Sequence, residues 1–149
     1  MRASDGSLSD DQALAVQVTN INDAPLITSL GGAGSATLTV DENQTAVIGL
    51  VATDDDATTT LRWSITGGAD GDRFVIDAAS GVLSLRDAPD HEAPADANAD
   101  NRYDVTVQVS DGSLSTTQAI AVTVTAVNDN TPAITSSSAF SVAENSTTV

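Results

Sequence analysis

Hydrophobic and polar residues alternate with a period of two along much of this chain. In AIAVTVTAV, residues 119–127, small or polar residues separate Ile120, Val122 and Val124, and RYDVTVQVS, residues 102–110, alternates in the same way. Successive side chains of a β-strand point to opposite faces of the sheet, so this pattern predicts two strands that each bury one face.

Five shorter apolar segments are also predicted to be strands, because clusters of Gly, Asp, Asn or Ser bound them. They lie at 36–40, 45–52, 61–66, 74–76 and 82–85. Seven strands in about 100 residues predict an all-β fold, a seven-stranded Greek-key β-sandwich of the immunoglobulin-like type. We expect Trp63, Phe74 and Tyr103 in its core.

The chain repeats itself at a spacing close to the length of one small domain. Residues 5–23 return at 111–129 with 13 of 19 positions identical, and VDENQTAV at 40–47 returns as VAENSTTV at 142–149. A period near 100 residues is longer than that of solenoid repeats, so we expect independent domains in a string. The predicted units are the C-terminal strand and linker of a preceding repeat (1–23), one complete repeat (26–131) and the N-terminal strand of a following repeat (132–149).

The duplicated strand leaves two interpretations open. Ala13–Thr19 nearly copies Ala119–Thr125, so either segment could occupy the same sheet edge, which would allow strand exchange within or between chains. Alternatively residues 1–23 are a frayed remainder, the interpretation we favour, and deleting residues 1–20 then leaves stability unchanged.

Composition indicates a cation as the small partner. Five basic residues, all Arg, face 21 acidic residues for a net charge of −16, which argues against nucleic acid or an anionic membrane as partner. Most of the acidic residues are Asp, which favours turns and oxygen-rich calcium loops. The chain has no Cys, which excludes disulfides and is compatible with an exported protein stabilised by Ca²⁺. We expect any export signal or membrane anchor to lie outside these residues.

Several sequence motifs follow one another in a characteristic order. They are VDENQTAVIGLVATDDD from Val40, LRWSITGG, FVIDAASGVLSL, PDHE, RYDVTVQVSDGSLS and AVNDNTP, which ends at Pro132. This order resembles the cadherin repeat, in particular the bacterial cadherin-like repeats of large surface adhesins, with Trp63 at a position where that family has Tyr. The resemblance implies a cadherin-type sandwich whose loops bind Ca²⁺.

The resemblance also implies which residues bind the metal. Ca²⁺ takes six to eight hard oxygen ligands, so one site needs carboxylates and carbonyls from several segments. At the C-terminal end of the complete repeat the implied ligands are Glu42, Asp90, Glu92 and Asp129, with Asn128 and Asn130 nearby. At the opposite end they are Asp54, Asp56 and Asp111, joined by Asn22 and Asp23 of the upstream linker. A metal there would bridge two repeats.

Some positions depart from the family pattern or suggest a separate site. Ala126 and Asn20 stand where the linker motif has its first Asp, and Ala24 replaces its second Asn, so we expect a junction to hold fewer than the family's usual three ions. DANADN at 96–101 alternates Asp96, Asn98 and Asp100 as in a calcium loop, but it lacks the Gly and distant Glu of an EF-hand. The alternative is an ordinary solvated insertion.

The residue inventory argues against an enzyme. His91 is the only histidine, and there is no Cys or Lys nucleophile. We therefore predict a calcium-rigidified structural and adhesive module in a long tandem-repeat protein, extracellular or on the cell surface. Its partners would be neighbouring repeats of the same chain and a polysaccharide or a cell-surface protein.

Two other functions stay open. A carbohydrate-binding module that attaches to polysaccharide is the alternative, and it would need an exposed aromatic platform. Homophilic adhesion ranks third, because the first-strand Trp that partners exchange in animal cadherins has no counterpart before Glu42.

Overall fold

The structure is a computed structural model that describes residues 1–32, 34–56 and 60–132. This part of the chain contains β-strands and two short 3-10 turns. The elements are β1 (Arg2–Ser4), β2 (Ser9–Asp11), β3 (Leu26–Ile27), η1 (Ser29–Gly32), β4 (Ser35–Asp41), β5 (Ala46–Gly49), β6 (Ala52–Thr53), β7 (Arg62–Gly67), η2 (Gly71–Arg73), β8 (Phe74–Ile76), β9 (Val82–Leu85), β10 (Arg102–Ser110) and β11 (Ser115–Thr125). The predicted all-β class is confirmed.

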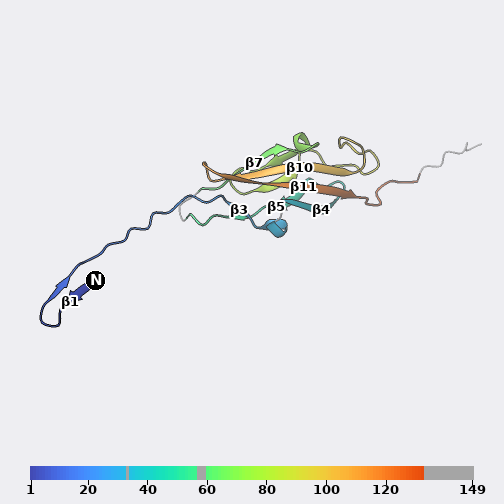
Figure 1. Ribbon diagram of the computed structural model, residues 1–149. Coiled ribbons are helices and arrows are strands. Elements are labelled where there is room, and N and C mark those ends of the chain that lie inside the picture. The colour runs from blue at the N-terminus through green and yellow to red at the C-terminus, as the bar shows by residue number, and fades with distance from the viewer. Residues whose placement is uncertain (33, 57–59, 133–149) are drawn as a thin grey trace, which may run out of the picture.

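The strands from β3 to β11 form two facing layers (Figure 1). One layer is a four-stranded sheet in the order β4-β11-β10-β7, and the other consists of β5-β9-β8 and the short pair β3-β6. Within the first sheet β10 and β11 are antiparallel, whereas β4 and β11 run parallel from Ser35 beside Ala119 to Asp41 beside Thr125. Because β4 and β11 are parallel, both leave the sheet at the same end of the sandwich.

The alternating pattern of β10 and β11 builds the core. Tyr103, Val105, Val107 and Val109 of β10 face inward, and so do Ile120, Val122 and Val124 of β11. All three aromatic residues predicted for the core are buried, and the rings of Phe74 and Tyr103 meet edge to face with centroids 6.5 Å apart.

One predicted strand is in fact two. The segment 45–52 first pairs with β9 as β5 and then pairs with β3 as β6. Between these ladders Leu50 is buried, and its N–H donates to the Gly81 carbonyl at 3.0 Å. The pairing with β9 ends at Gly49 and the pairing with β3 begins at Ala52, so the chain leaves one neighbour for another within a few residues. The prediction of one strand was wrong because an apolar run does not reveal a change of partner.

A close approach of backbone shapes the connection after β7. Gly68 has a φ of +101°, and a Cβ there would lie 2.3 Å from the Asp104 carbonyl oxygen. Asp70, which is 3% exposed, follows this turn. Its Oδ2 accepts the Asp104 N–H at 2.9 Å, and its Oδ1 accepts the Ala97 N–H at 2.6 Å. Asp70 therefore ties β10 to the long segment that precedes it.

The N-terminal hairpin β1-β2 lies apart from the sandwich (Figure 1). Its register pairs Ala3 with Asp10, which is the register of Val109 with Thr116 at the β10-β11 turn. The copies Asp5 and Asp111 each accept the two following turn N–H groups of the DGSL sequence. The repeated turn therefore forms from local sequence alone.

Residues 12–25, which follow the hairpin, form no strand. Leu14, Val16 and Val18 are 68%, 78% and 89% exposed, although their copies in β11 are buried. Strand β11, and not the segment Ala13–Thr19, pairs with β4. The repeat boundaries proposed from the sequence remain a prediction.

Candidate functional site

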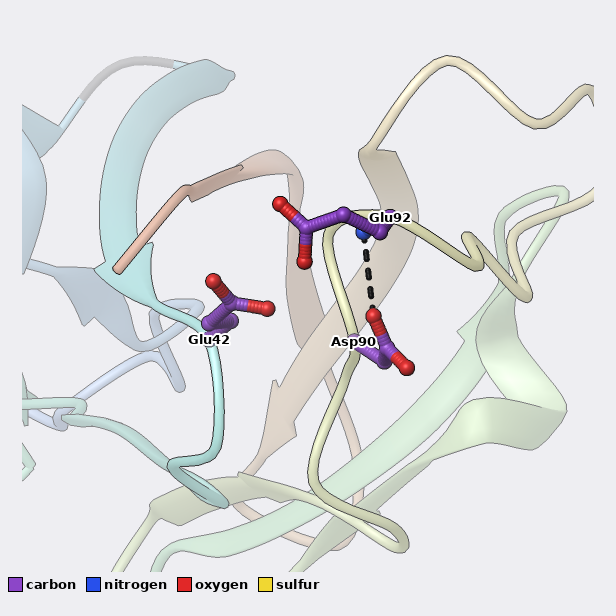
Figure 2. Close-up of side chains that lie close together, drawn as sticks. All are labelled: Glu42, Asp90 and Glu92. Atoms are coloured by element: carbon purple, nitrogen blue, oxygen red, sulfur yellow. Dashed lines mark hydrogen bonds between the residues drawn. The ribbon is translucent and has the colours of Figure 1, made fainter. Parts of the chain in front are cut away.

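Three carboxylates meet where β4 and β11 leave the sheet (Figure 2). Glu42 directly follows β4, and Asp90 and Glu92 come from the segment between β9 and β10. One carboxylate oxygen of each residue lies within 4.8 Å of the others. Figure 2 shows Glu92 reaching across from the Asp90 segment toward Glu42. The sequence assigned these three residues to one site, and the structure brings them together.

Glu42 is the buried member of this group, at 2% exposure. Its Oε2 accepts the His91 N–H at 2.7 Å, and its Oε1 accepts the Val127 N–H at 2.6 Å. The His91 N–H, followed by the Val127 N–H, holds the pKa of Glu42 below its ordinary value. Glu42 is therefore an anion that joins the loop after β9 to the linker after β11.

Asp90 shapes the turn that carries Glu92. Its Oδ1 accepts the N–H of Glu92 at 3.0 Å and that of Ala93 at 3.2 Å. The first of these bonds is the dashed line in Figure 2. Both side chains are exposed, so the carboxylate group opens to solvent on the side away from Glu42.

Asp129 lies beside this group but outside the 4.8 Å triple. Its Oδ2 accepts the Asn43 side-chain N–H at 2.6 Å, and the Asn43 backbone N–H donates to the Pro89 carbonyl at 2.9 Å. Asn128 and Asn130 are exposed on the same linker segment. Sequence reasoning gave Asn43 no role. The signal that could have found it is its place directly after Glu42 in a Glu-Asn pair that resembles the family motif.

The donor set at this pole fits Ca²⁺. All three groups offer hard carboxylate oxygens, and two oxygens bound to one Ca²⁺ lie at most about 5 Å apart. Among the described residues, the side chain of His91 lies close to the triple, with its Nδ1 3.7 Å from Glu92 Oε1, and the two form an ion pair only when the imidazole is protonated. Three carboxylates this close repel one another, and a bound cation would relieve that repulsion.

The opposite pole gathers the second predicted set. Asn22 donates its side-chain N–H to Asp111 Oδ2 at 2.7 Å, and the Asp23 backbone N–H donates to Asp56 Oδ2 at 2.8 Å. The Asn20 side chain also donates to Asp56, a contact that the sequence did not predict. The N–H of Leu114, followed by the Asn22 side chain, holds the pKa of Asp111 below its ordinary value.

One carboxylate oxygen at this pole has no hydrogen-bond partner among the described residues. Asp54 Oδ1 accepts the Asp56 N–H at 2.8 Å, whereas its Oδ2 is buried and receives no hydrogen bond from the described residues. Buried polar atoms are normally hydrogen-bonded, and an orphaned carboxylate oxygen among other acidic residues suits a cation. The donor set of this pole therefore also fits Ca²⁺.

The DANADN segment has a different organisation. Asp96 is 7% exposed, and its two oxygens accept the N–H groups of Asp100 and Asn101 at 2.9 and 3.1 Å. The Asn98 side chain donates to Asp100 Oδ2 at 2.8 Å. The oxygens of Asp96 are thus directed at the backbone of their own loop.

The described residues offer no surface for stacking sugar rings. Their aromatic side chains are Trp63, Phe74 and Tyr103, and all three are buried. In the same part of the chain no helix has the length and apolar character needed to cross a membrane.

Comparison with known proteins identifies the family. The model of the cadherin domain matches residues 36–126, which is more than half of the chain. The chain belongs to the cadherin domain family. This confirms the resemblance seen in the sequence and places the chain in a family of extracellular, adhesion-type modules that are structural and not enzymatic.

Solved structures show the same fold at low sequence identity. The protocadherin gammaB7 EC3-6 cis-dimer matches with a TM-score of 0.63 and 24% identity over 83% of this chain and 31% of that chain. Human protocadherin-24 EC1-2 matches with a TM-score of 0.56 and 23% identity over 73% of this chain and 48% of that chain. The human desmocollin-1 ectodomain matches with a TM-score of 0.56 and 21% identity over 77% and 21%. This cadherin domain therefore spans less than half of each of these chains.

A curated relative comes from a prokaryote. Halomucin of Haloquadratum walsbyi is 46% identical over 37 residues, which is 25% of this chain and rounds to 0% of that protein. So short a match shows no more than a local likeness between the two sequences.

Proposed function

We propose that this cadherin domain is a calcium-stiffened link in a long tandem-repeat protein on the cell surface or outside the cell. The observation that carries the proposal is the presence of an acidic group at each pole of one sandwich. At one pole Glu42, Asp90 and Glu92 meet within 4.8 Å, and at the other the upstream linker contacts Asp56 and Asp111. A domain with ligands at both ends is suited to joining neighbours on either side.

Each pole would hold metal with the residues expected from the sequence. The C-terminal pole would use Glu42, Asp90, Glu92 and Asp129, with Asn128 and Asn130 nearby, and the N-terminal pole would use Asp54, Asp56, Asp111, Asn22 and Asp23. A Ca²⁺ bound by both a domain and its linker would cross-link them and fix the angle between repeats.

The N-terminal hairpin supports a tandem arrangement. It has the sequence and register of the β10-β11 turn, and the apolar residues that follow it are exposed here although their copies in β11 are buried. In the full protein the rest of a preceding repeat would cover Leu14, Val16 and Val18.

A two-repeat protein tests this function directly. Residues 26–110 are placed ahead of residues 5–132, which joins the repeats where their sequences overlap and leaves the linker native. The upstream copies of Glu42, Asp90 and Glu92 then face the N-terminal pole of the second repeat. Calorimetry should show more bound Ca²⁺ per chain than two single repeats bind together, and small-angle X-ray scattering should show a longer, stiffer particle in Ca²⁺ than in EDTA.

The matched control changes Asp54 and Asp56 to Asn in the second repeat, which removes junctional carboxylates and leaves the other pole intact. This variant should keep part of the binding and lose the calcium-dependent stiffening. Identical scattering of the unmodified two-repeat protein in Ca²⁺ and in EDTA would refute the proposed function.

A further inference from the structure

The segment between β9 and β10 carries two of the proposed ligands without containing a strand. Asp90 and Glu92 lie near its start, and DANADN lies at its end. A segment this long needs other contacts to hold it in one conformation. Those contacts come from buried polar side chains.

Asp96 fixes the end of the segment. Its carboxylate accepts the N–H groups of Asp100 and Asn101, and it is 7% exposed. Burial alone would raise the pKa of Asp96, but the N–H groups of Asp100 and Asn101 outweigh it and the pKa is lowered. Asn101 is held with a φ of +63°, a left-handed conformation that Asn tolerates better than most residues.

Asn101 then reaches back to the start of the segment. Its side-chain N–H donates to the His91 carbonyl at 2.9 Å, and its own carbonyl accepts the Val124 N–H of β11 at 2.8 Å. The His91 N–H in turn donates to Glu42 Oε2 at 2.7 Å. His91, which lies between Asp90 and Glu92 in the sequence, is therefore held by Glu42 on its N–H side and by Asn101 on its carbonyl side.

We infer that Asp96 and Asn101 are positioning residues for Asp90 and Glu92. They fix the backbone at His91 before any metal arrives, so that the two carboxylates are already turned toward Glu42. A site held in its binding geometry loses less conformational entropy when it takes a ligand. DANADN would then hold the backbone that carries Asp90 and Glu92, and would not bind a metal ion itself. The calcium part of the inference rests on the proposed function.

The test uses Asn101→Gly in the full chain. Glycine adopts positive φ without strain, so this change removes the side-chain amide while the backbone conformation stays accessible. Ala99→Gly is the matched control, because Ala99 also has a positive φ, of 57°, and its side chain is exposed. Both variants gain the flexibility of glycine, but only Asn101→Gly loses the bond to the His91 carbonyl.

Two quantities are measured. In EDTA, NMR-detected hydrogen exchange at the amides of His91, Glu92 and Ala93 should be about three- to tenfold faster in Asn101→Gly, the effect of losing one hydrogen bond. Calorimetry should show weaker Ca²⁺ binding by a factor of similar size. Ala99→Gly should change neither quantity, and exchange in β10 and β11 should match the wild type in both variants.

The two ideas fail separately. If the wild type binds no Ca²⁺, the proposed metal site is wrong, and the exchange measurement still decides the positioning role. Unchanged exchange at His91, Glu92 and Ala93 in Asn101→Gly would overturn that role, and so would faster exchange throughout β10 and β11, which would indicate general destabilisation. Should Asn101→Gly not fold, Asn101→Asp replaces it for the exchange measurement, because its carboxylate keeps the size but has no N–H to donate.

Discussion

Replacing Asp70 by Asn should destabilise the sandwich by an amount that its hydrogen bonds define. Asp70 is 3% exposed, and each of its oxygens accepts one backbone N–H, from Ala97 and from Asp104. An Asn side chain has one acceptor oxygen and one NH₂ group, so one backbone N–H would face a donor. A buried donor left without a partner costs about 1–3 kcal/mol, and we expect a loss of about 2 kcal/mol in the free energy of unfolding. For a domain of this size that lowers Tm by about 8 °C.

Urea denaturation in EDTA, followed by the fluorescence of Trp63, measures this loss. Trp63 is the single tryptophan and is 6% exposed, so unfolding changes its environment strongly. Asp72→Asn is the control. Asp72 lies two residues after Asp70 and its side chain is exposed, so this change removes the same charge and should alter stability by less than about 0.5 kcal/mol. Equal urea midpoints for Asp70→Asn and Asp72→Asn would show that the hydrogen bonds of Asp70 do not stabilise the fold.

Three further predictions concern the poles and the N-terminus. Glu92→Ala should reduce the rise in Tm that Ca²⁺ causes, because it removes a ligand of one pole, whereas Asp87→Ala, an exposed change in the same segment, should leave the rise unchanged; calorimetry with thermal melting decides. Because backbone N–H groups hold the pKa of Glu42 below its ordinary 4.5, its contribution to stability is present above that value and is lost as the pH falls through the lower folded-state pKa. Glu42→Gln should therefore flatten the dependence of the urea midpoint on pH as the pH falls below 4.5, and an unchanged slope would contradict this. Deleting residues 1–20 should leave the urea midpoint in EDTA nearly unchanged, since the hairpin lies apart from the sandwich and the contact of Asn20 with Asp56 is an exposed one; a loss above about 1 kcal/mol would show that this segment packs on the sandwich.

The strands that could be predicted from the sequence are those that bury one face along their whole length. In β10 every second residue from Tyr103 to Val109 is apolar, and the same holds in β11 from Ile120 to Val124; a period of two is the direct consequence of burial on one side. Strands β3 and β6 have two residues each, which is too short for any periodicity. The parallel pairing of β4 with β11 joins segments about 80 residues apart, and alternation within a strand says nothing about its neighbour.

The candidate site was predictable only through the family resemblance. Strands β5 to β9 lie between Glu42 and Asp90 in the sequence, so no local spacing brings Glu42 together with Asp90 and Glu92. Asp70 gave no signal, and Asn101 was noticed only as the end of DANADN, a candidate calcium loop, because a polar residue that binds the backbone of a distant loop has the same sequence appearance as a solvated turn residue. Their roles depend on burial, which only the fold determines.

The topology explains why both poles of one small domain carry acidic groups. Because β4 and β11 are parallel, the Glu42 that follows one and the linker that follows the other emerge side by side, and the Val127 N–H reaches Glu42 Oε1 at 2.6 Å. The β10-β11 turn with Asp111 lies at the other end of β11, whose 11 residues span about 36 Å. No side chain crosses that distance, so metal at one pole cannot share ligands with metal at the other. In the proposed array each ion would therefore stiffen one junction only, and the rigid sandwich would carry the orientation set at one junction to the next.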